Sequence, residues 1–172
     1  MQENIFSLPI FIDKVDLSKI KLEDESLEHC FPSRVLSSFS KNNKIGSEFL
    51  RYLEELIFNN IKKIPSNYKT LDIVEIWRNV YKTYDHQDPH IHSLFQWSFI
   101  IYETVSESKT VFVNPSSKLI DNQMHNYQEP FNLTYIPKCK KGDILIFPSF
   151  LEHYVLSGNE GSTISGNVQL TV

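Results

Sequence analysis

The sequence predicts a mainly β domain of the sandwich or jelly-roll type, with one substantial helix ahead of most of the strands. Two observations support this fold class. Short runs rich in β-branched and aromatic residues recur from residue 71 onward, and turn-forming residues separate them. Residues 45–64 instead repeat their apolar side chains at three- and four-residue steps, which is the period of a helix. Many short strands at regular spacing are typical of sandwiches and jelly rolls.

The N-terminal part is expected to supply one strand and the helix. Residues 5–13 have the composition of a strand, and Pro9 within them indicates an edge position or a bulge, because proline cannot donate to a β-ladder. Residues 14–43 are polar and irregular. The apolar residues of the segment 45–64 fall on one helical face, and Ser47 is the expected N-terminal cap.

Strands are expected throughout the rest of the chain. They are predicted at residues 71–81, 95–102, 110–113, 133–136, 143–147, 153–156 and 163–172. Residues 116–131 are expected to be irregular and, with residues 14–43, to provide substrate loops. No internal repeat or low-complexity tract interrupts the pattern, so a single domain spanning residues 1–172 is predicted.

Composition excludes several classes of protein. The net charge of −4 gives no electrostatic support for nucleic-acid binding. The apolar runs are much shorter than the roughly 18–20 residues of a membrane span. The first residues carry an acidic and no basic side chain, unlike a secretory signal. Cys30 and Cys139 are far apart and outside any CxxC motif, which indicates reduced thiols in a cytoplasmic protein.

Residues 85–92 hold three of the six histidines and suggest a metal site. In a strand, residues i and i+2 point to one face, so His90 and His92 would project together. His153 follows the predicted strand 143–147 and would lie at the mouth of another strand. Three neutral imidazoles suit a divalent first-row metal and leave coordination positions open, as in a catalytic site.

A second metal motif overlaps the first. His86-Gln87-Asp88 is the first half of a two-histidine, one-carboxylate site. The Asp88-Pro89 pair is typical of a turn, and His90-Ile91-His92 leads more directly into the next strand. The spacing therefore favours His90 and His92 over His86 and Asp88. The other two histidines, His29 and His125, are expected to be loop residues.

Five segments, in order along the chain, resemble the bacterial and phage branch of the 2-oxoglutarate/Fe(II)-dependent oxygenases. They are Ile5–Phe11, Trp77-Arg78-Asn79, Pro89–His92 with Trp97–Tyr102, Phe112–Pro115, and Lys141–Val155. The match at Gly142–Val155 is the most specific. The resemblance implies a double-stranded β-helix (jelly-roll) fold, Fe(II) held by His90, His92 and His153, and 2-oxoglutarate as co-substrate. It also implies hydroxylation of a C–H bond in a small-molecule or peptide substrate.

One departure from the family concerns the co-substrate. Members usually carry an arginine about ten residues beyond the distal histidine, where it binds the far carboxylate of 2-oxoglutarate. Thr163 occupies that position here. Thr163 and Ser165 could face the site, Lys109 could supply a charge from another strand, and Asn79 is a further polar candidate on the same strand face as Trp77.

This departure leaves two alternatives open. A three-histidine iron dioxygenase could act without 2-oxoglutarate and would consume O2 with a directly chelating substrate. A non-catalytic jelly-roll binding module would consume none.

Overall fold

The computed structural model describes residues 7–22, 26–30, 35–41, 45–124, 126–127, 131–158 and 160–172. Its helices are α1 (Ser47–Ile61) and α2 (Ser117–Met124), with 3-10 turns at Leu17–Lys19 and Phe39–Lys41. Its strands are β1 (Phe11–Lys14), β2 (Glu28–His29), β3 (Leu36–Ser37), β4 (Thr70–Tyr81), β5 (Gln87–His90), β6 (Trp97–Tyr102), β7 (Thr110–Val113), β8 (Thr134–Tyr135), β9 (Asp143–Pro148), β10 (His153–Val155) and β11 (Gly161–Thr171).

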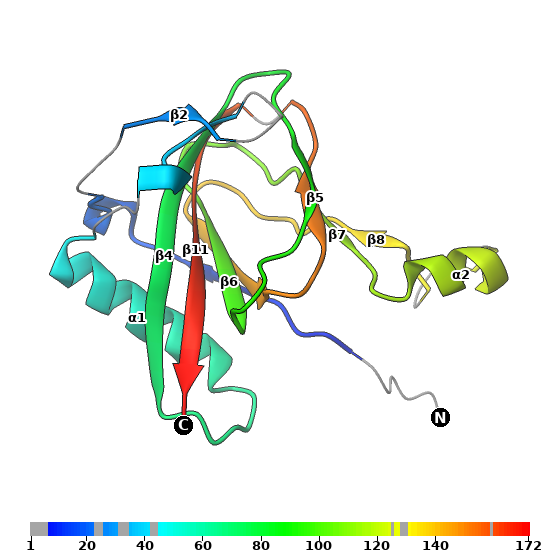
Figure 1. Cartoon of the computed structure of the whole chain (residues 1–172), viewed down its shortest axis with the longest axis horizontal. Coiled ribbons are helices and arrows are strands. Elements are labelled where there is room, and N and C mark those ends of the chain that lie inside the picture. The colour runs from blue at the N-terminus through cyan, green and yellow to red at the C-terminus, as the bar shows by residue number, and fades with distance from the viewer. Residues whose placement is uncertain are drawn as a thin grey trace.

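The strands form two antiparallel sheets. The larger has the order β1-β9-β6-β11-β4-β3-β2, and the smaller has the order β5-β10-β7-β8. The long strands β4 and β11 run side by side through the larger sheet, and β5 and β7 lie to one side of them (Figure 1). The mainly β architecture with one substantial N-terminal helix is as predicted.

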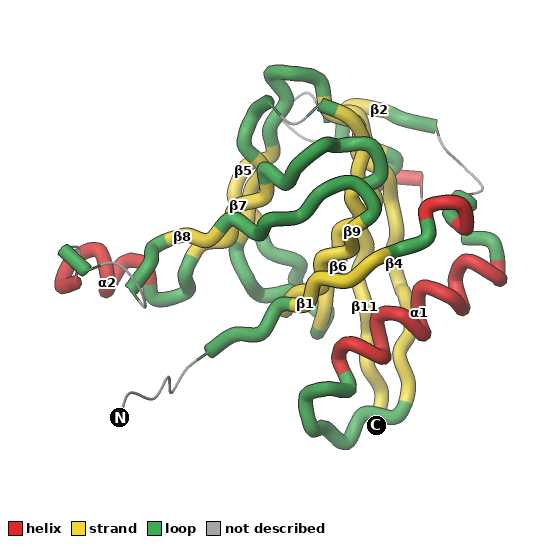
Figure 2. The backbone as a smooth tube through the Cα atoms, turned by 180° about the vertical axis from the view of Figure 1, so that it is seen from behind, coloured by secondary structure: helices red, strands yellow, loops and turns green. Residues whose placement is uncertain are grey.

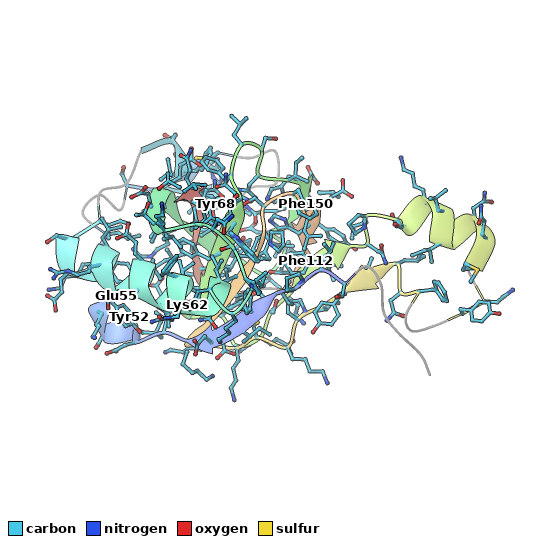
Figure 3. All side chains as sticks on the ribbon, turned by 90° about the horizontal axis from the view of Figure 1, so that it is seen from below. Tyr52, Glu55, Lys62, Tyr68, Phe112 and Phe150 are labelled. Carbon is cyan, nitrogen blue, oxygen red and sulfur yellow. The ribbon has the colours of Figure 1, made fainter. Side chains whose placement is uncertain are left out.

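The larger sheet has one apolar face, which packs against α1. Alternation along β6, β9 and β11 places buried aliphatic and aromatic side chains on this face: Phe99, Ile101, Ile144, Ile146 and Ile164. The matching stripe of α1 is Phe49, Leu53, Ile57 and Ile61. α1 runs along this side of the sheet (Figure 2), and Glu55 of the helix is exposed (Figure 3). Each fully buried side chain of this size contributes about 1.5–3 kcal/mol.

The opposite face of the same strands is more polar. Strand register places its side chains in rows across β4, β11 and β6. The rows are Glu75, Asn167 and Ser98; Trp77, Ser165 and Ile100; and Asn79, Thr163 and Tyr102. These rows form the wall on which the functional site is built.

A β-bulge interrupts the pairing of β11 with β4. Asn167 pairs with Glu75, but the next residue, Val168, pairs with Ile73. Such a shift re-aims the side chains on either side of it. Here Asn167 points into the polar wall, while Val168 joins the core against α1.

Several local predictions need correction. Gly46, not Ser47, is the N-terminal cap of α1. It makes no side-chain capping bond because glycine has no side chain, and its carbonyl accepts the first helical hydrogen bond from Leu50. Residues 14–43 contain short strands and 3-10 turns, and His29 lies in β2 rather than in a loop. Residues 116–131 contain α2. His125 lies outside the described residues.

The strand predicted at residues 5–13 begins later than expected, because β1 starts at Phe11 and Pro9 precedes it. The predicted edge position is confirmed for β1, which pairs with β9 at the end of the larger sheet. α2 and β8 project from the body of the molecule (Figures 1 and 2), and α2 buries none of its residues.

Within the described residues, neither helix has the length and apolar character needed to cross a membrane.

Candidate metal centre

Three histidines converge between the two sheets. His90 ends β5 and His153 begins β10, and the two residues are directly opposite each other in the ladder. His92 lies two residues beyond β5. One ring nitrogen from each imidazole lies within 4.8 Å of the other two. The ring centroids of His90 and His153 are 4.4 Å apart, and those of His92 and His153 are 5.2 Å apart.

The reason that His90 and His92 converge differs from the predicted one. The i, i+2 argument assumed that both residues lie on one strand, but the strand ends at His90. His92 belongs to the following loop, where its backbone N–H donates to the carbonyl of Ser149 at 3.0 Å. A turn of the chain back toward the larger sheet therefore brings the second imidazole to the first.

Backbone carbonyls orient two of the three rings. Nδ1 of His90 bonds to the carbonyl of Asp88 at 2.7 Å, and Nδ1 of His153 bonds to the carbonyl of Leu151 at 2.9 Å. A carbonyl can only accept, so Nδ1 carries the proton in both rings. In the neutral form of each ring Nε2 then has the free lone pair that can bind a metal. The ring of His92 instead lies near the side chain of Asn167.

Burial keeps two of the rings neutral. It lowers the pKa of His153 to about 3, and the nearby His90 adds to that effect. It lowers the pKa of His92 to about 4; His90 again adds to the effect, and the neighbouring Asn167 side chain opposes it. Metal ligands must be deprotonated, so little proton competition is expected from either ring near neutral pH. Three converging imidazoles, two of them kept neutral by burial, fit a divalent first-row metal such as Fe(II).

The histidines open onto a cavity of about 630 Å³. Its wall is the polar face of the larger sheet, including Trp77, Asn79 and Tyr81 of β4. The indole Nε1 of Trp77 and the Oδ1 of Asn79 are buried and have no hydrogen-bond partner in the described part of the chain. Buried polar atoms almost always have a partner, so these two atoms mark places where a bound molecule or water is expected to bond.

The structure separates the residues suggested for the co-substrate into two groups. Asn79, Thr163 and Ser165 line the cavity. Lys109 does not, and its ammonium group lies 2.5 Å from the carboxylate of Glu107. Among the described residues that line the cavity there is no lysine or arginine.

The alternative motif, His86 and Asp88, lies outside the histidine cluster. The two side chains are exposed by 52% and 63%, and Nε2 of His86 is 3.6 Å from the carboxylate of Asp88. Asp88 lines the mouth of the cavity, whereas His86 does not line the cavity. The backbone carbonyl of Asp88, rather than its carboxylate, contributes to the site by orienting His90.

Three residues that line the cavity were not assigned to the site from the sequence. Tyr81 lines the cavity, and its hydroxyl donates to Oε1 of Gln87 at 2.8 Å. The alternation Trp77, Asn79, Tyr81 could have revealed it. Glu75 and Asn167 are joined by a 2.6 Å hydrogen bond across β4 and β11. No sequence signal pairs two residues 92 positions apart.

Three converging imidazoles beside a cavity are the arrangement expected of a metal site with open coordination positions. The model of the family described as "Putative 2OG-Fe(II) oxygenase" matches residues 75–165, from β4 into β11. The chain therefore belongs to the 2-oxoglutarate/Fe(II) oxygenase family, which uses Fe(II) and 2-oxoglutarate. Family membership favours this class over the two alternatives considered from the sequence.

Solved structures support the fold. HygX from Streptomyces hygroscopicus, with nickel, 2-oxoglutarate and hygromycin B bound, matches with a TM-score of 0.57 at 12% identity, covering 95% of this chain and 84% of HygX. A 2OG-Fe(II) oxygenase family oxidoreductase from Burkholderia pseudomallei matches with a TM-score of 0.53 at 8% identity, covering 89% and 73% of the two chains. A prolyl-4-hydroxylase from Pseudomonas putida gives 0.51 at 11% identity, covering 80% and 70%. No curated protein matches the chain.

Proposed function

We propose that His90, His92 and His153 hold the Fe(II) of a 2-oxoglutarate-dependent hydroxylase. The observation that carries this proposal is the convergence of three imidazoles, two of which have Nδ1 bonded to a carbonyl and so present Nε2. With 2-oxoglutarate and O2, Fe(II) in such a site supplies the oxidising chemistry that hydroxylates a C–H bond. The protein's own contribution is to hold the ligands, exclude water and position the substrate.

Metal titration of single variants tests this ligand set. Anaerobic calorimetry with Fe(II), or with Ni(II) in air, is expected to give one ion per wild-type chain. His90→Ala, His92→Ala and His153→Ala should each weaken binding by at least about 100-fold, because even supporting residues cost 10- to 100-fold. His86→Ala is the matched control and should bind as the wild type does. Loss of binding in His86→Ala, with retention in His90→Ala, would instead favour the alternative motif.

We propose that neutral donors, rather than an arginine, meet the carboxylates of 2-oxoglutarate. Asn79, Thr163 and Ser165 line the cavity beside Tyr81. The single O–H of Tyr81 already donates to Oε1 of Gln87 at 2.8 Å, so the amide of Asn79 and the hydroxyls of Thr163 and Ser165 are the donors left for a carboxylate. Hydrogen bonds to a charged acceptor are worth roughly 1.5–3 kcal/mol each, so several can partly replace one guanidinium pair.

A nearly isosteric substitution tests the role of Thr163. Thr163→Val removes the hydroxyl and keeps the volume, so the KM for 2-oxoglutarate should rise by about tenfold, as expected for one lost bond to a charged group. Thr134→Val, in the exposed strand β8, is the control and should leave the KM unchanged. An unchanged KM in Thr163→Val would remove this residue from the proposal.

We propose that the substrate, a small molecule or a peptide, presents an apolar group to the mouth of the cavity. Phe39, Ile91 and Leu94 line the cavity, and their side chains are exposed by 44%, 50% and 93%. The carboxylates at the cavity are those of Glu75 and Asp88. Apolar compounds without an acidic group should therefore stimulate 2-oxoglutarate turnover more than their carboxylate-bearing counterparts do.

Three broader expectations remain part of the proposal. A single domain is supported by the cavity, which draws its lining from both sheets. A cytoplasmic location is supported by two free cysteines, Cys30 and Cys139. The absence of a nucleic-acid partner is supported by the net charge of −4.

One observation favours a second candidate function. The described residues lining the cavity include no cation for the far carboxylate of 2-oxoglutarate. An iron dioxygenase whose substrate chelates the metal directly would need none. Oxygen uptake that depends on such a substrate and is indifferent to 2-oxoglutarate would support this function over the first.

A further inference from the structure

We propose that the carboxylate of Glu75 binds a positively charged amino group of the substrate, so that the substrate is an apolar amine. This rests on the proposed function, because it names the chemical class of the molecule that enters the same cavity. Glu75 has no place in the metal-ligand motif, and its contact with an amine can be measured in the metal-free protein.

A chain of hydrogen bonds holds the Glu75 carboxylate in the cavity wall. Glu75, Asn167 and Ser98 lie side by side on β4, β11 and β6. The hydroxyl of Ser98 donates to Oδ1 of Asn167 at 2.8 Å, and Nδ2 of Asn167 donates to Oε2 of Glu75 at 2.6 Å. Asn167 is only 2% exposed and Ser98 only 1%, so water has little access to these bonds. One oxygen of the carboxylate is therefore fixed by the sheet.

The other oxygen of the carboxylate is available to a ligand. Glu75 is half-buried and lines the cavity, and Oε1 accepts no hydrogen bond from the part of the chain that the structure describes. The described lining of the cavity also offers no lysine or arginine to pair with it. A substrate that displaces water from this carboxylate must supply a donor in its place, and a charged donor makes the stronger hydrogen bond.

A single fixed carboxylate fits an organic cation better than a metal ion. Ca²⁺ takes about six to eight oxygen ligands, and Mg²⁺ requires near-octahedral oxygen coordination. The other carboxylate of the cavity, that of Asp88, is 63% exposed at the mouth and lies 3.6 Å from Nε2 of His86. Among the described residues, the one cluster suited to a metal is the three histidines. An ammonium group needs far fewer acceptors, so a protonated amine is the cation that Glu75 can hold.

Aromatic rings next to Glu75 also favour a cation. Trp77 is two residues along β4 and points to the same face, and Phe39 packs edge-to-face against it with ring centroids 4.9 Å apart. Phe39 lines the cavity and is 44% exposed. The face of an aromatic ring attracts an ammonium group within about 6 Å. Carboxylate and rings together make this end of the cavity suitable for an apolar amine.

The amino group and the reacting carbon of such a substrate lie apart. Trp77 stacks on His92 with ring centroids 5.7 Å apart and planes inclined at 22°. Glu75 is two strand residues further along β4, which is about 7 Å. A substrate held by its amino group at Glu75 therefore presents to the histidines a carbon several bonds away from the nitrogen.

Binding of hexylamine to the metal-free protein tests the proposal. Hexylamine is protonated near neutral pH, and 1-hexanol is a neutral comparison of equal chain length. The wild type should bind hexylamine at least about tenfold more tightly than 1-hexanol. Glu75→Gln should abolish this preference, because a hydrogen bond between two charged groups is lost. Asp72→Asn changes an exposed carboxylate on the same strand and is the matched control, which should keep the preference.

The two tryptophans of the chain locate the bound amine. Trp77 lines the cavity, whereas Trp97 packs against the core beside α1. In nitrogen-15 NMR, hexylamine should shift the indole N–H signal of Trp77 and leave that of Trp97 unchanged. A shift confined to Trp97 would place the amine elsewhere and overturn the proposal.

Reversal of the charge separates recognition of the amine from packing. Glu75→Lys should bind hexanoate more tightly than hexylamine, an inversion that loss of packing alone would not produce. Equal affinity of the wild type and Glu75→Gln for hexylamine would overturn the proposal, as would a wild type that does not bind hexylamine or does not prefer it to 1-hexanol. Because these measurements need no metal, failure of the histidines to bind a metal would overturn the proposed function and leave the amine result standing.

Discussion

At the mouth of the cavity, Leu94 combines two unfavourable features. Its φ of 76° lies in the left-handed region, and within the described residues it is the one non-glycine with a positive φ. Its side chain is 93% exposed. A branched side chain held in this conformation costs about 1–3 kcal/mol, and such strain is found most often at functional sites. A role in contacting substrate accounts for both features.

Leu94→Gly is expected to stabilise the free protein. Glycine adopts a positive φ without strain, and replacing the exposed leucine removes little buried surface. The free energy of unfolding should therefore rise by about 0.5–1 kcal/mol, after the entropic cost of glycine is subtracted from the relief of strain. Urea unfolding would measure the difference. The same variant should reduce stimulation of turnover by apolar compounds. A loss of stability would show that Leu94 is held by packing, not by strain.

Residue identity alone accounts for only part of the site. The chemistry of imidazole and its spacing predicted His90, His92 and His153, and side-chain alternation predicted that Asn79 shares a face with Trp77. Lys109 was suggested only because the chain lacks a nearby arginine, and its pairing with Glu107 depends on loop geometry that no motif encodes. Glu75 was not predicted, because nothing local distinguishes it from an ordinary solvated strand carboxylate.

Among the elements, β11 depends on a glycine at its centre. A Cβ on Gly166 would lie 2.4 Å from Cζ of Phe99 and 2.6 Å from the carbonyl oxygen of Glu75. Phe99 is fully buried, so it cannot move aside. Only glycine lets β4, β6 and the core against α1 approach β11 this closely.

Gly166→Ala should therefore destabilise the fold by about 2–3 kcal/mol, the scale of overpacking a core. Gly46→Ala is the matched control, because the nearest atom to its Cβ, in Lys21, is 3.8 Å away. It should cost less than about 1 kcal/mol, as expected at a helix cap. Thermal unfolding of both variants provides the comparison. Equal losses would contradict the close approach at β11.

A hydrogen bond between β1 and α1 should make stability depend on pH. Nδ2 of Asn60 donates to the carboxylate of Asp13 at 2.8 Å and lowers the pKa of Asp13; partial burial opposes the shift. A lowered pKa in the folded state stabilises the protein above the unfolded value of about 4, and that contribution is lost as pH falls through the folded value.

Asp13→Ala should accordingly cost stability at pH 7 and little at pH 2–3. Since Asp13 is largely solvated, the loss at pH 7 should be less than about 1 kcal/mol. Asp121→Ala, an exposed carboxylate on α2, should show no comparable dependence. Urea unfolding at both pH values measures the effect. A loss of equal size at pH 2–3 would indicate a packing role for Asp13.

Helices and strands were predicted correctly from the sequence where their apolar residues repeat with a clear period. The segment 71–81 became β4 (Thr70–Tyr81), and residues 110–113 became β7 with the same bounds. β5 and α2 were missed, because four residues containing a proline and eight mostly polar residues carry little periodicity. The bulge at Asn167 was also beyond sequence reasoning, because it depends on the register between two distant strands.

For the molecule as a whole, the two faces of the larger sheet have different roles, one in folding stability and the other in binding. One face is apolar and packs on α1, and the other carries the polar rows that line the cavity. Substitutions on the first face should act mainly on folding, and substitutions on the second mainly on metal, co-substrate and substrate binding. The single strand β4 serves both faces, with Ile76 toward the helix side and Trp77 toward the histidines.

The most direct measurement of the central claim is the visible spectrum of the protein with Fe(II) and 2-oxoglutarate under anaerobic conditions, followed by admission of O2. The account predicts a charge-transfer band that requires both additions and is absent from His153→Ala, and then formation of succinate. Absence of the band, together with no succinate in air, would contradict the assignment of His90, His92 and His153 to a 2-oxoglutarate-dependent iron site.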